Sequence, residues 1–232
     1  MIQIKSLDFK YEDERILKNI NLELKDGCYT AIIGANGSGK TTLAKHLNAL
    51  LMPTKGSVIV DDIDTKKDQF SVRKKVGFVF QNPEDQLVYS IVEEDVAFGL
   101  ENLGMKTKEM KNKVIEIMKD LDIEYLAKKN VNMLSAGQKQ LTALAGILAM
   151  SPKYIVFDEP TTLLDNKNKK NIMGLINKLN KRSNIGVILV TNLLSDIKYA
   201  ENVIVMGKGS IIFNGKKSEL NKKILKGAGL DA

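Results

Sequence analysis

Residues 34–41, with the sequence GANGSGKT, have the composition of a loop that binds phosphate groups. The loop follows a short apolar run and is predicted to open a helix. Gly34, Gly37 and Gly39 let the backbone curl until successive N–H groups face an anion, and the helix N-terminus adds its positive dipole end. Lys40 supplies a point charge to the terminal phosphates, and the Thr41 hydroxyl is the expected Mg²⁺ ligand. The alternative is a glycine-rich turn with an incidental lysine.

Two acids end a second apolar run, YIVFDE at residues 154–159. Ligands of open α/β sheets bind at the C-terminal ends of the strands, where this run would deliver its carboxylates. Asp158 is predicted to hold Mg²⁺, mostly through water, and Glu159 to polarise the water that attacks the terminal phosphate. Acids after strands are common in loops, so this motif is informative only together with the phosphate loop.

A third motif, LSAGQ at residues 134–138, precedes a predicted helix. Alone it indicates only an N-cap. The order of the motifs is more specific: the phosphate loop, Gln81 after a strand, the serine-glycine cap and the acidic strand. With this order and spacing, nearly the whole chain, from Tyr11 to the run NVIVM at residues 202–206, resembles the ATP-binding cassette (ABC) ATPases.

The resemblance implies a role for each motif. Tyr11 matches the aromatic residue that stacks on adenine, Gln81 the residue that reaches Mg²⁺ and the attacking water, and Asp165 the end of the D-loop. The ATP-binding loop would comprise Gly34, Ala35, Asn36, Gly37, Ser38, Gly39, Lys40, Thr41 and Thr42. The signature motif, which in this family acts on the partner subunit's ATP, would comprise Ser135, Ala136, Gly137 and Gln138.

The same resemblance implies the fold and the assembly. The fold is a P-loop NTPase (RecA-like) α/β core with an inserted α-helical subdomain and an N-terminal antiparallel β subdomain. ATP and Mg²⁺ are the implied ligands, held between the two subunits of a head-to-tail dimer that closes on ATP and opens after hydrolysis. The sequence leaves open whether the second ATPase subunit is a copy of this chain or a different one.

The stretch VGFVFQNPEDQLV, residues 76–88, resembles the energy-coupling-factor (ECF) importers, which serve vitamins, cobalt and nickel. In that group it lies under a transmembrane subunit, so Glu84 and Asp85 are candidates to receive arginines from coupling helices. The alternative is an ordinary polar loop. The resemblance implies transmembrane coupling and substrate-binding subunits as partners, no nucleic acid, and a peripheral location at the cytoplasmic face of the cell membrane.

Asn192 departs from the family pattern, because a histidine that contacts the γ-phosphate is usual after a strand such as GVILVT. An asparagine amide can donate a hydrogen bond but is shorter and never carries positive charge. We therefore hypothesise intact ATP binding with slowed hydrolysis.

His46, the one histidine, lies too far along the phosphate-loop helix to replace the histidine missing at position 192 and is predicted to be a helix-packing or surface residue. Ala136, where glycine is commoner in the signature, is expected to have a mild effect.

Short apolar or alternating runs must position these motifs as strands. They lie at residues 2–9, 19–24, 28–34, 57–60, 76–80, 154–159, 186–191, 202–206 and 210–215, and the last two form a hairpin. Helical periodicity dominates residues 91–150, and further helices are predicted at residues 40–51, at 168–181 and after Asn192. We predict one ABC ATPase domain over residues 1–232, with a core at 1–83 and 151–232 and a helical subdomain at 84–150.

The composition is that of a globular protein, with 44% hydrophobic and 27% charged residues. The net charge of +7 comes from scattered lysines, which favours a solubilising role over nucleic-acid binding. Cys28 is expected to be a small core residue, and no apolar run approaches the ~18 residues that span a bilayer. Two other functions stay open: a non-transport ABC ATPase and a hydrolysis-impaired regulatory nucleotide-binding subunit.

Overall fold

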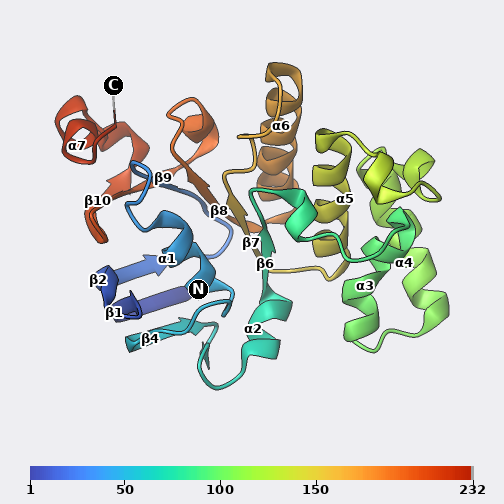
Figure 1. The fold of residues 1–232 in the computed structure, drawn as a ribbon, viewed down its shortest axis with the longest axis horizontal. Helices are drawn as coiled ribbons and strands as arrows, with labels where there is room; N and C mark the ends of the chain where they lie inside the picture. The colour runs from blue at the N-terminus through green and yellow to red at the C-terminus, as the bar shows by residue number, and fades with distance from the viewer. Residues whose placement is uncertain (231–232) are drawn as a thin grey trace. The chain divides into compact units, whose positions relative to one another are not determined.

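The computed structural model describes residues 1–230 of the chain. They form an α/β fold with a six-stranded and a four-stranded sheet, as the P-loop NTPase assignment predicts (Figure 1). Two compact units are distinguished: Met1–Phe78, Lys153–Glu159 and Met173–Ala232 make up the first, and Val79–Pro152 and Pro160–Ile172 the second. Each unit is described by itself below. The predicted boundaries of a single ATPase domain stay a prediction.

The six-stranded sheet carries the strands that precede the phosphate loop and the acids. Its order is β10 (Ser210–Lys216), β9 (Asn202–Gly207), β3 (Tyr29–Ile33), β8 (Gly186–Thr191), β7 (Tyr154–Asp158) and β6 (Val76–Val79). Strand β3 pairs in parallel with β8 and β9, and β7 pairs in parallel with β8. Every residue of β3, β7 and β8 is buried, because both faces of a parallel sheet are covered.

The four-stranded sheet has the order β2 (Glu14–Leu24), β1 (Ile2–Tyr11), β4 (Lys55–Val60) and β5 (Ile63–Asp64). It is antiparallel, and the buried positions of β1 include Ile2, Ile4, Leu7 and Phe9, as expected of a sheet with one covered face. The first unit also contains α1 (Lys40–Leu47), α2 (Gln69–Lys75) and α7 (Lys222–Gly227). Helix α1 contacts β2 and β4 of this sheet.

The second unit is mainly helical. It contains α3 (Val92–Asn102), α4 (Thr107–Asp120) and α5 (Ala136–Ala149), which pack against one another (Figure 1), with short 3₁₀ turns at η1 (Pro83–Asp85), η2 (Glu124–Leu126) and η3 (Val131–Met133). Helix α6 (Asn166–Ser183) begins in this unit. Long apolar side chains recur on one face of α4, where Val114, Ile117 and Met118 are buried.

The predicted strands are all present, and β9 and β10 form the predicted hairpin. The prediction that α1 extends to residue 51 is wrong, because Asn48 caps the helix and Ala49 takes a left-handed φ of 56°. The helix predicted after Asn192 is also wrong: only the 3₁₀ turn η4 (Asp196–Tyr199) forms there. The Asp196 carboxylate accepts hydrogen bonds from Thr191 and Ser195, which compete with regular helical structure.

The prediction that Cys28 is a small core residue is also wrong, because its side chain is half-buried.

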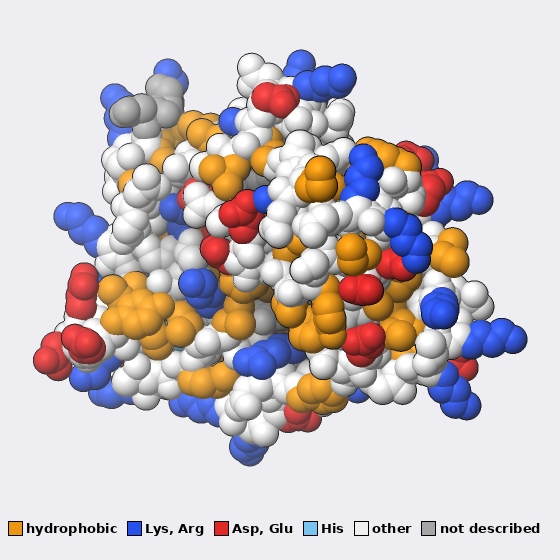
Figure 2. Space-filling model, turned by 45° about the vertical axis from the view of Figure 1, so that its right-hand side comes forward, with side chains coloured by type: hydrophobic (Ala, Val, Ile, Leu, Met, Phe, Trp, Pro, Cys, Tyr) orange, Lys and Arg blue, Asp and Glu red, His pale blue; other side chains and the backbone are white. Residues whose placement is uncertain are grey.

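Charged side chains are dispersed over one face of the molecule. Figure 2 shows lysines and arginines interspersed with acidic and neutral side chains on the face in view, which accords with a solubilising role. Among residues 1–230, no helix combines the length and the apolar composition that crossing a bilayer requires.

Asp95 is the polar residue that fixes the start of the helical unit. The sequence places it with Glu93 and Glu94 in the first turn of α3, where acids complement the helix dipole. The structure adds a second role, because the buried Asp95 Oδ1 accepts hydrogen bonds from the backbone N–H groups of Val88 (2.6 Å) and Tyr89 (2.9 Å). Burial raises the pKa of Asp95, while these two N–H groups act in the opposite direction.

Asp95→Ala is expected to lower the free energy of unfolding by about 2–4 kcal/mol, because it leaves two backbone donors without their charged acceptor. Urea denaturation followed by circular dichroism measures the loss. Glu94→Ala, an exposed acid of the same helical turn, is the matched control and should cost at most about 1 kcal/mol. Equal losses in the two variants would show that only the helix dipole is involved.

Candidate functional site

The phosphate loop has the curled backbone that the glycines predict. Gly37 and Gly39 have φ angles of 74° and 98°, and Gly39 is the N-cap of α1. A Cβ atom on Gly39 would lie 3.0 Å from Leu17 Cδ2, a tight contact, and the φ of 98° is one that residues with a side chain rarely adopt. The loop therefore joins the buried strand β3 to the N-terminus of α1, which is the arrangement that binds phosphate.

Lys40 is buried in the first turn of α1, with 5% of its surface exposed. Its Nζ donates hydrogen bonds to the carbonyl oxygens of Gly34 (2.9 Å) and Ala35 (3.0 Å). Burial lowers the pKa of Lys40, and the nearby carboxylates of Glu159 and Asp158 partly offset this effect. A cation held by two carbonyls of the phosphate loop, near two acids, is suited to a ligand that carries both phosphate and a metal ion.

The phosphate loop and the acidic strand meet at Thr41 and Asp158. The Thr41 hydroxyl donates to Asp158 Oδ1 at 2.9 Å across 117 residues of sequence. Asp158 is buried, and desolvation raises its pKa. Mg²⁺ is usually held by one or two protein oxygens together with phosphates and water, so a hydroxyl and a carboxylate at this distance fit it. Residues 1–230 contain no cluster of three or more acidic, histidine or cysteine side chains that could hold a metal by themselves.

Glu159, the predicted water-activating residue, has an unusual backbone. It adopts a left-handed φ of 47°, which costs a residue other than glycine about 1–3 kcal/mol. Its N–H group donates to the carbonyl oxygen of Val190 at 2.9 Å, so strand β8 holds this conformation. The bond continues the pairing of β7 with β8 directly after Asp158.

Asn192 follows β8 in the same unit and is half-buried. Its Nδ2 donates to Oδ1 of Asn36 in the phosphate loop at 3.2 Å. The Thr191 hydroxyl accepts the N–H of Leu193 (3.0 Å) and donates to Asp196 (3.2 Å), which fixes the backbone around Asn192. This contact brings Asn192 beside the phosphate loop, and no sequence pattern indicated Asn36 as its partner.

Tyr11, predicted to stack on adenine, lies at the end of β1 with 47% of its surface exposed. Its ring contacts Phe9 edge-on, with ring centroids 4.8 Å apart.

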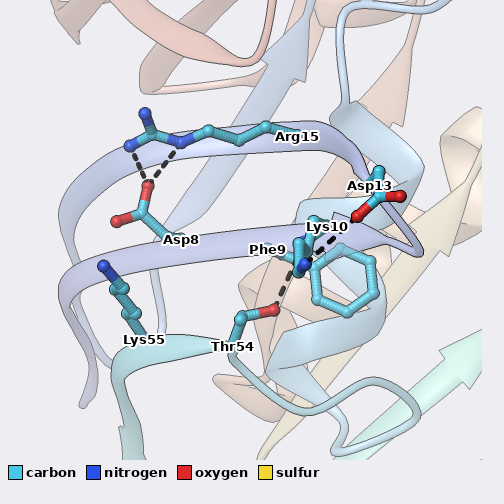
Figure 3. Close-up of a pocket in the computed structure, with 7 residues that line it drawn as sticks. All are labelled: Asp8, Phe9, Lys10, Asp13, Arg15, Thr54 and Lys55. Atoms are coloured by element: carbon cyan, nitrogen blue, oxygen red, sulfur yellow. Dashed lines mark hydrogen bonds and ion pairs between the residues drawn. The ribbon is translucent and has the colours of Figure 1, made fainter.

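A hollow of about 420 Å³ lies beside Phe9. Figure 3 shows the Phe9 ring near Lys10 and Thr54, with the paired Asp8 and Arg15 farther along the strands. The acids of this hollow are balanced by lysines and arginine, and no residue of the phosphate loop lines it.

The predicted signature residues form a helix cap in the second unit. Ser135 Oγ accepts the N–H of Gln138, and the Gln138 side chain accepts the N–H of Ser135 at 3.0 Å, which makes a capping box at the start of α5. Ala136 is exposed, so its methyl group meets no packed neighbour that would displace it. A Cβ on Gly137 would lie 3.4 Å from the side chain of Asn168.

Asp165 caps the start of α6 in the same unit. Its Oδ1 accepts the N–H groups of Lys167 and Asn168, both at 2.9 Å, and its Oδ2 accepts Asn168 Nδ2 at 2.7 Å. These bonds lower the pKa of Asp165. The predicted D-loop acid is therefore ionised and held in place by local hydrogen bonds.

The remaining predicted residues lie near η1, also in the second unit. Gln81 follows β6 and is exposed. Glu84 forms an ion pair with Lys139 of α5, and Asp85 Oδ1 accepts Asn82 Nδ2 at 3.3 Å. An arginine that approached Glu84 would thus compete with Lys139. The roles of all these site residues stay predictions.

Comparisons with known proteins agree with this geometry. Residues 17–162 match the family model described as ABC transporter. The chain is 46% identical to the energy-coupling factor transporter ATP-binding protein EcfA1 of Clostridioides difficile, over the whole of this chain and 86% of that protein.

Two solved structures are also similar. The structure of cbiO1 from Clostridium perfringens, described as part of the ABC transporter complex cbiONQ, has a TM-score of 0.86 and 35% identity, covering 99% of this chain and 94% of that one. The ATP-binding cassette MJ0796, described as a dimer in a post-hydrolysis state bound to ADP and Pi, has a TM-score of 0.83 and 32% identity over 93% of this chain and 98% of that one. The chain therefore belongs to the ABC transporter family as one of its ATP-binding cassettes, and it is an ATPase.

Proposed function

We propose that the chain is the ATP-hydrolysing subunit of an ECF-type importer for a vitamin or a transition-metal ion. The observation that carries the catalytic part is the contact between Thr41 and Asp158, because it brings the phosphate loop and the acidic strand to one point. Similarity to the C. difficile ECF protein over the whole chain supports the transport part.

The residues of the first unit can perform phosphoryl transfer by position and charge. The loop N–H groups and Lys40 bind the β- and γ-phosphates of ATP, and Tyr11 stacks on the adenine. Glu159 accepts a proton from the attacking water, and Asn192 donates a hydrogen bond to the γ-phosphate. Thr41 and Asp158 would hold Mg²⁺. Gln81, which belongs to the second unit, stays a further ligand predicted from the family resemblance. When bound, the ion neutralises charge that develops on the phosphate oxygens.

The second unit supplies what a dimer needs. The capping box at Ser135 fixes the N-terminus of α5, a 14-residue helix whose positive dipole end suits the γ-phosphate of a partner subunit's ATP. The similar cassette described as dimeric supports a pair of ATPase subunits, for which we propose the head-to-tail arrangement. The ATPase partner is a second copy or a different subunit.

The contact with membrane subunits would involve η1. Glu84 and Asp85 are exposed acids that can receive arginines of coupling helices, Asp85 more readily because Lys139 already pairs with Glu84. Such a contact would place the protein at the cytoplasmic face of the membrane. The similar cbiO1 structure, described as part of a complex, supports membrane subunits as partners.

Lys40→Met is expected to weaken ATP binding about 10- to 100-fold, because one charge-assisted contact to phosphate is worth about 1.5–3 kcal/mol. Isothermal titration calorimetry with magnesium and a non-hydrolysable ATP analogue measures the affinity. Lys5→Met, which removes an exposed lysine of β1, is the control and should bind as the unmodified chain does. Equal affinity in all three proteins would contradict the assignment of the loop.

The transport role is tested by purifying the tagged chain from detergent-solubilised membranes and analysing the intact complex by mass spectrometry. We expect a second ATPase subunit together with transmembrane proteins. Asp85→Arg should release the membrane proteins while keeping the ATPase dimer, because it turns an attraction for arginine into repulsion. Recovery of ribosomes or nucleic acid instead would favour a non-transport ABC ATPase.

Asn192 favours a second candidate, a regulatory nucleotide-binding subunit whose own site hydrolyses ATP slowly. Its amide is already engaged by Asn36 and carries no charge. In a heterodimer, the other composite site would then provide most of the turnover. The Asn192 variant described in the Discussion distinguishes this candidate from a fully active subunit.

A further inference from the structure

His46 lies on α1, the helix that follows the phosphate loop, and is linked by ring contacts to Tyr11, the residue predicted to stack on adenine. The sequence left open whether it is a surface or a helix-packing residue, and the structure shows that its side chain is completely buried, with 0% exposed. The ring Nδ1 lies 2.7 Å from the carbonyl oxygen of Thr42, one turn earlier in α1. This bond fixes the orientation of the ring, and the ring packs against Phe9 of the four-stranded sheet that α1 contacts.

Three aromatic rings link buried His46 to exposed Tyr11. The His46 ring meets Phe9 edge-on, with centroids 4.7 Å apart and an interplanar angle of 77°. Phe9 in turn meets Tyr11 edge-on at 4.8 Å and 89°. Residues 9 and 11 share a face of β1, because side chains alternate along a strand. The three rings therefore form a continuous row from the interior to the exposed ring of Tyr11.

The side chains of His46 and Phe9, the inner two rings of the row, are tightly packed. Phe9 is 8% exposed and His46 is 0% exposed, so both rings are enclosed by packed neighbours. Burial lowers the pKa of His46, although the carbonyls of Thr42 and Met52 oppose this effect, so the ring is favoured in its neutral form. A neutral ring can be packed against Phe9 without the cost of a buried charge.

We propose that His46 is a positioning residue for the base of the bound nucleotide. It holds Phe9 edge-on, Phe9 holds Tyr11, and the Tyr11 ring is thereby kept ready to stack on a flat heterocycle. Since Lys40 and Thr41 begin the helix that ends one residue after His46, the same helix fixes the phosphate site and the base site. The inference depends on the proposed role of Tyr11 in the adenine site.

The test compares two ligands, a non-hydrolysable ATP analogue and inorganic tripolyphosphate, each with magnesium, by isothermal titration calorimetry. His46→Leu is expected to weaken binding of the analogue about 2- to 12-fold relative to tripolyphosphate, which is the effect of losing one edge-to-face contact. The quantity compared is the ratio of the affinity for the analogue to the affinity for tripolyphosphate. His46→Phe, which restores an aromatic ring without the hydrogen bond, should recover most of this ratio. An equal loss for both ligands would overturn the proposal, because it would mean a purely structural role.

Two further variants separate the possible failures. Tyr11→Ala must lower the ratio of the two affinities; if it does not, the adenine assignment of the proposed function fails. If Tyr11→Ala lowers the ratio and His46→Leu does not, only the role of His46 fails. Phe9→Leu decides the matter if His46→Leu does not fold, since an unchanged ratio would remove the row of rings as the cause. Ile176→Ala, a buried substitution in α6, controls for general destabilisation and should leave the ratio unchanged.

Discussion

Glu159→Gln should lower the steady-state ATPase rate of the assembled dimer about a thousandfold, within the range of about 10²–10⁴ that a positioned general base contributes. Glutamine has nearly the same shape, so the left-handed backbone and the N–H bond to Val190 are expected to persist. The amide cannot accept a proton from the attacking water. ATP binding is expected to continue, so the variant should accumulate as a closed dimer with ATP.

Phosphate release measures the rate, and size-exclusion chromatography with ATP and magnesium measures the dimer. Glu109→Gln, an exposed glutamate of α4, serves as the matched control and should keep the full rate. A Glu159→Gln protein that hydrolyses ATP at the control's rate would show that another group activates the water. Loss of ATP binding would instead indicate that the turn after β7 has been disturbed.

Asn192→His is expected to raise hydrolysis at this site about 10²- to 10³-fold, the usual effect of one hydrogen-bond donor in the transition state. In the structure, the Asn192 amide donates one N–H to Asn36, so only its second N–H is left for a ligand. A histidine reaches farther and can carry positive charge, which the γ-phosphate stabilises as its own charge develops.

The rates should be compared for the native chain and the variant, each with and without its partner subunits. Asn214→His, on an exposed position of β10, controls for the added imidazole. Equal rates of native and Asn192→His proteins in every assembly would contradict slowed hydrolysis and, with it, the regulatory candidate. An increase confined to this chain's own site would support a heterodimer with one fast and one slow site.

The sequence predicted the fold and the main motifs because both depend on local patterns. Short apolar runs are sufficient to indicate buried parallel strands, and the phosphate loop combines glycines, a lysine and a helix start within eight residues. The cap at Ser135 was equally local. These features are set by the residues themselves and their immediate neighbours.

Contacts between distant residues could not be predicted in the same way. Asn36 and Asn192 are 156 residues apart, and no pattern in either segment indicates the other. Glu159 adopts a positive φ although glutamate does not favour it, and its N–H bonds a strand more than 30 residues later in the chain. Asp95 looked like one of three dipole-complementing acids, and only the fold of the preceding loop shows that it binds two backbone N–H groups.

The register of the central strands has a practical consequence for protein engineering. The last residues of β8 pair with the ends of both neighbouring strands: Val190 with Asp158 of β7, and Thr191 with Ile33 of β3. The register of β8 therefore determines where the ends of β7 and β3 lie relative to each other. A chimera that imported β8 alone from another cassette would have to match both alignments at once. Exchanging β3, β7 and β8 as a block avoids this problem for β8, because that strand then keeps both of its original neighbours.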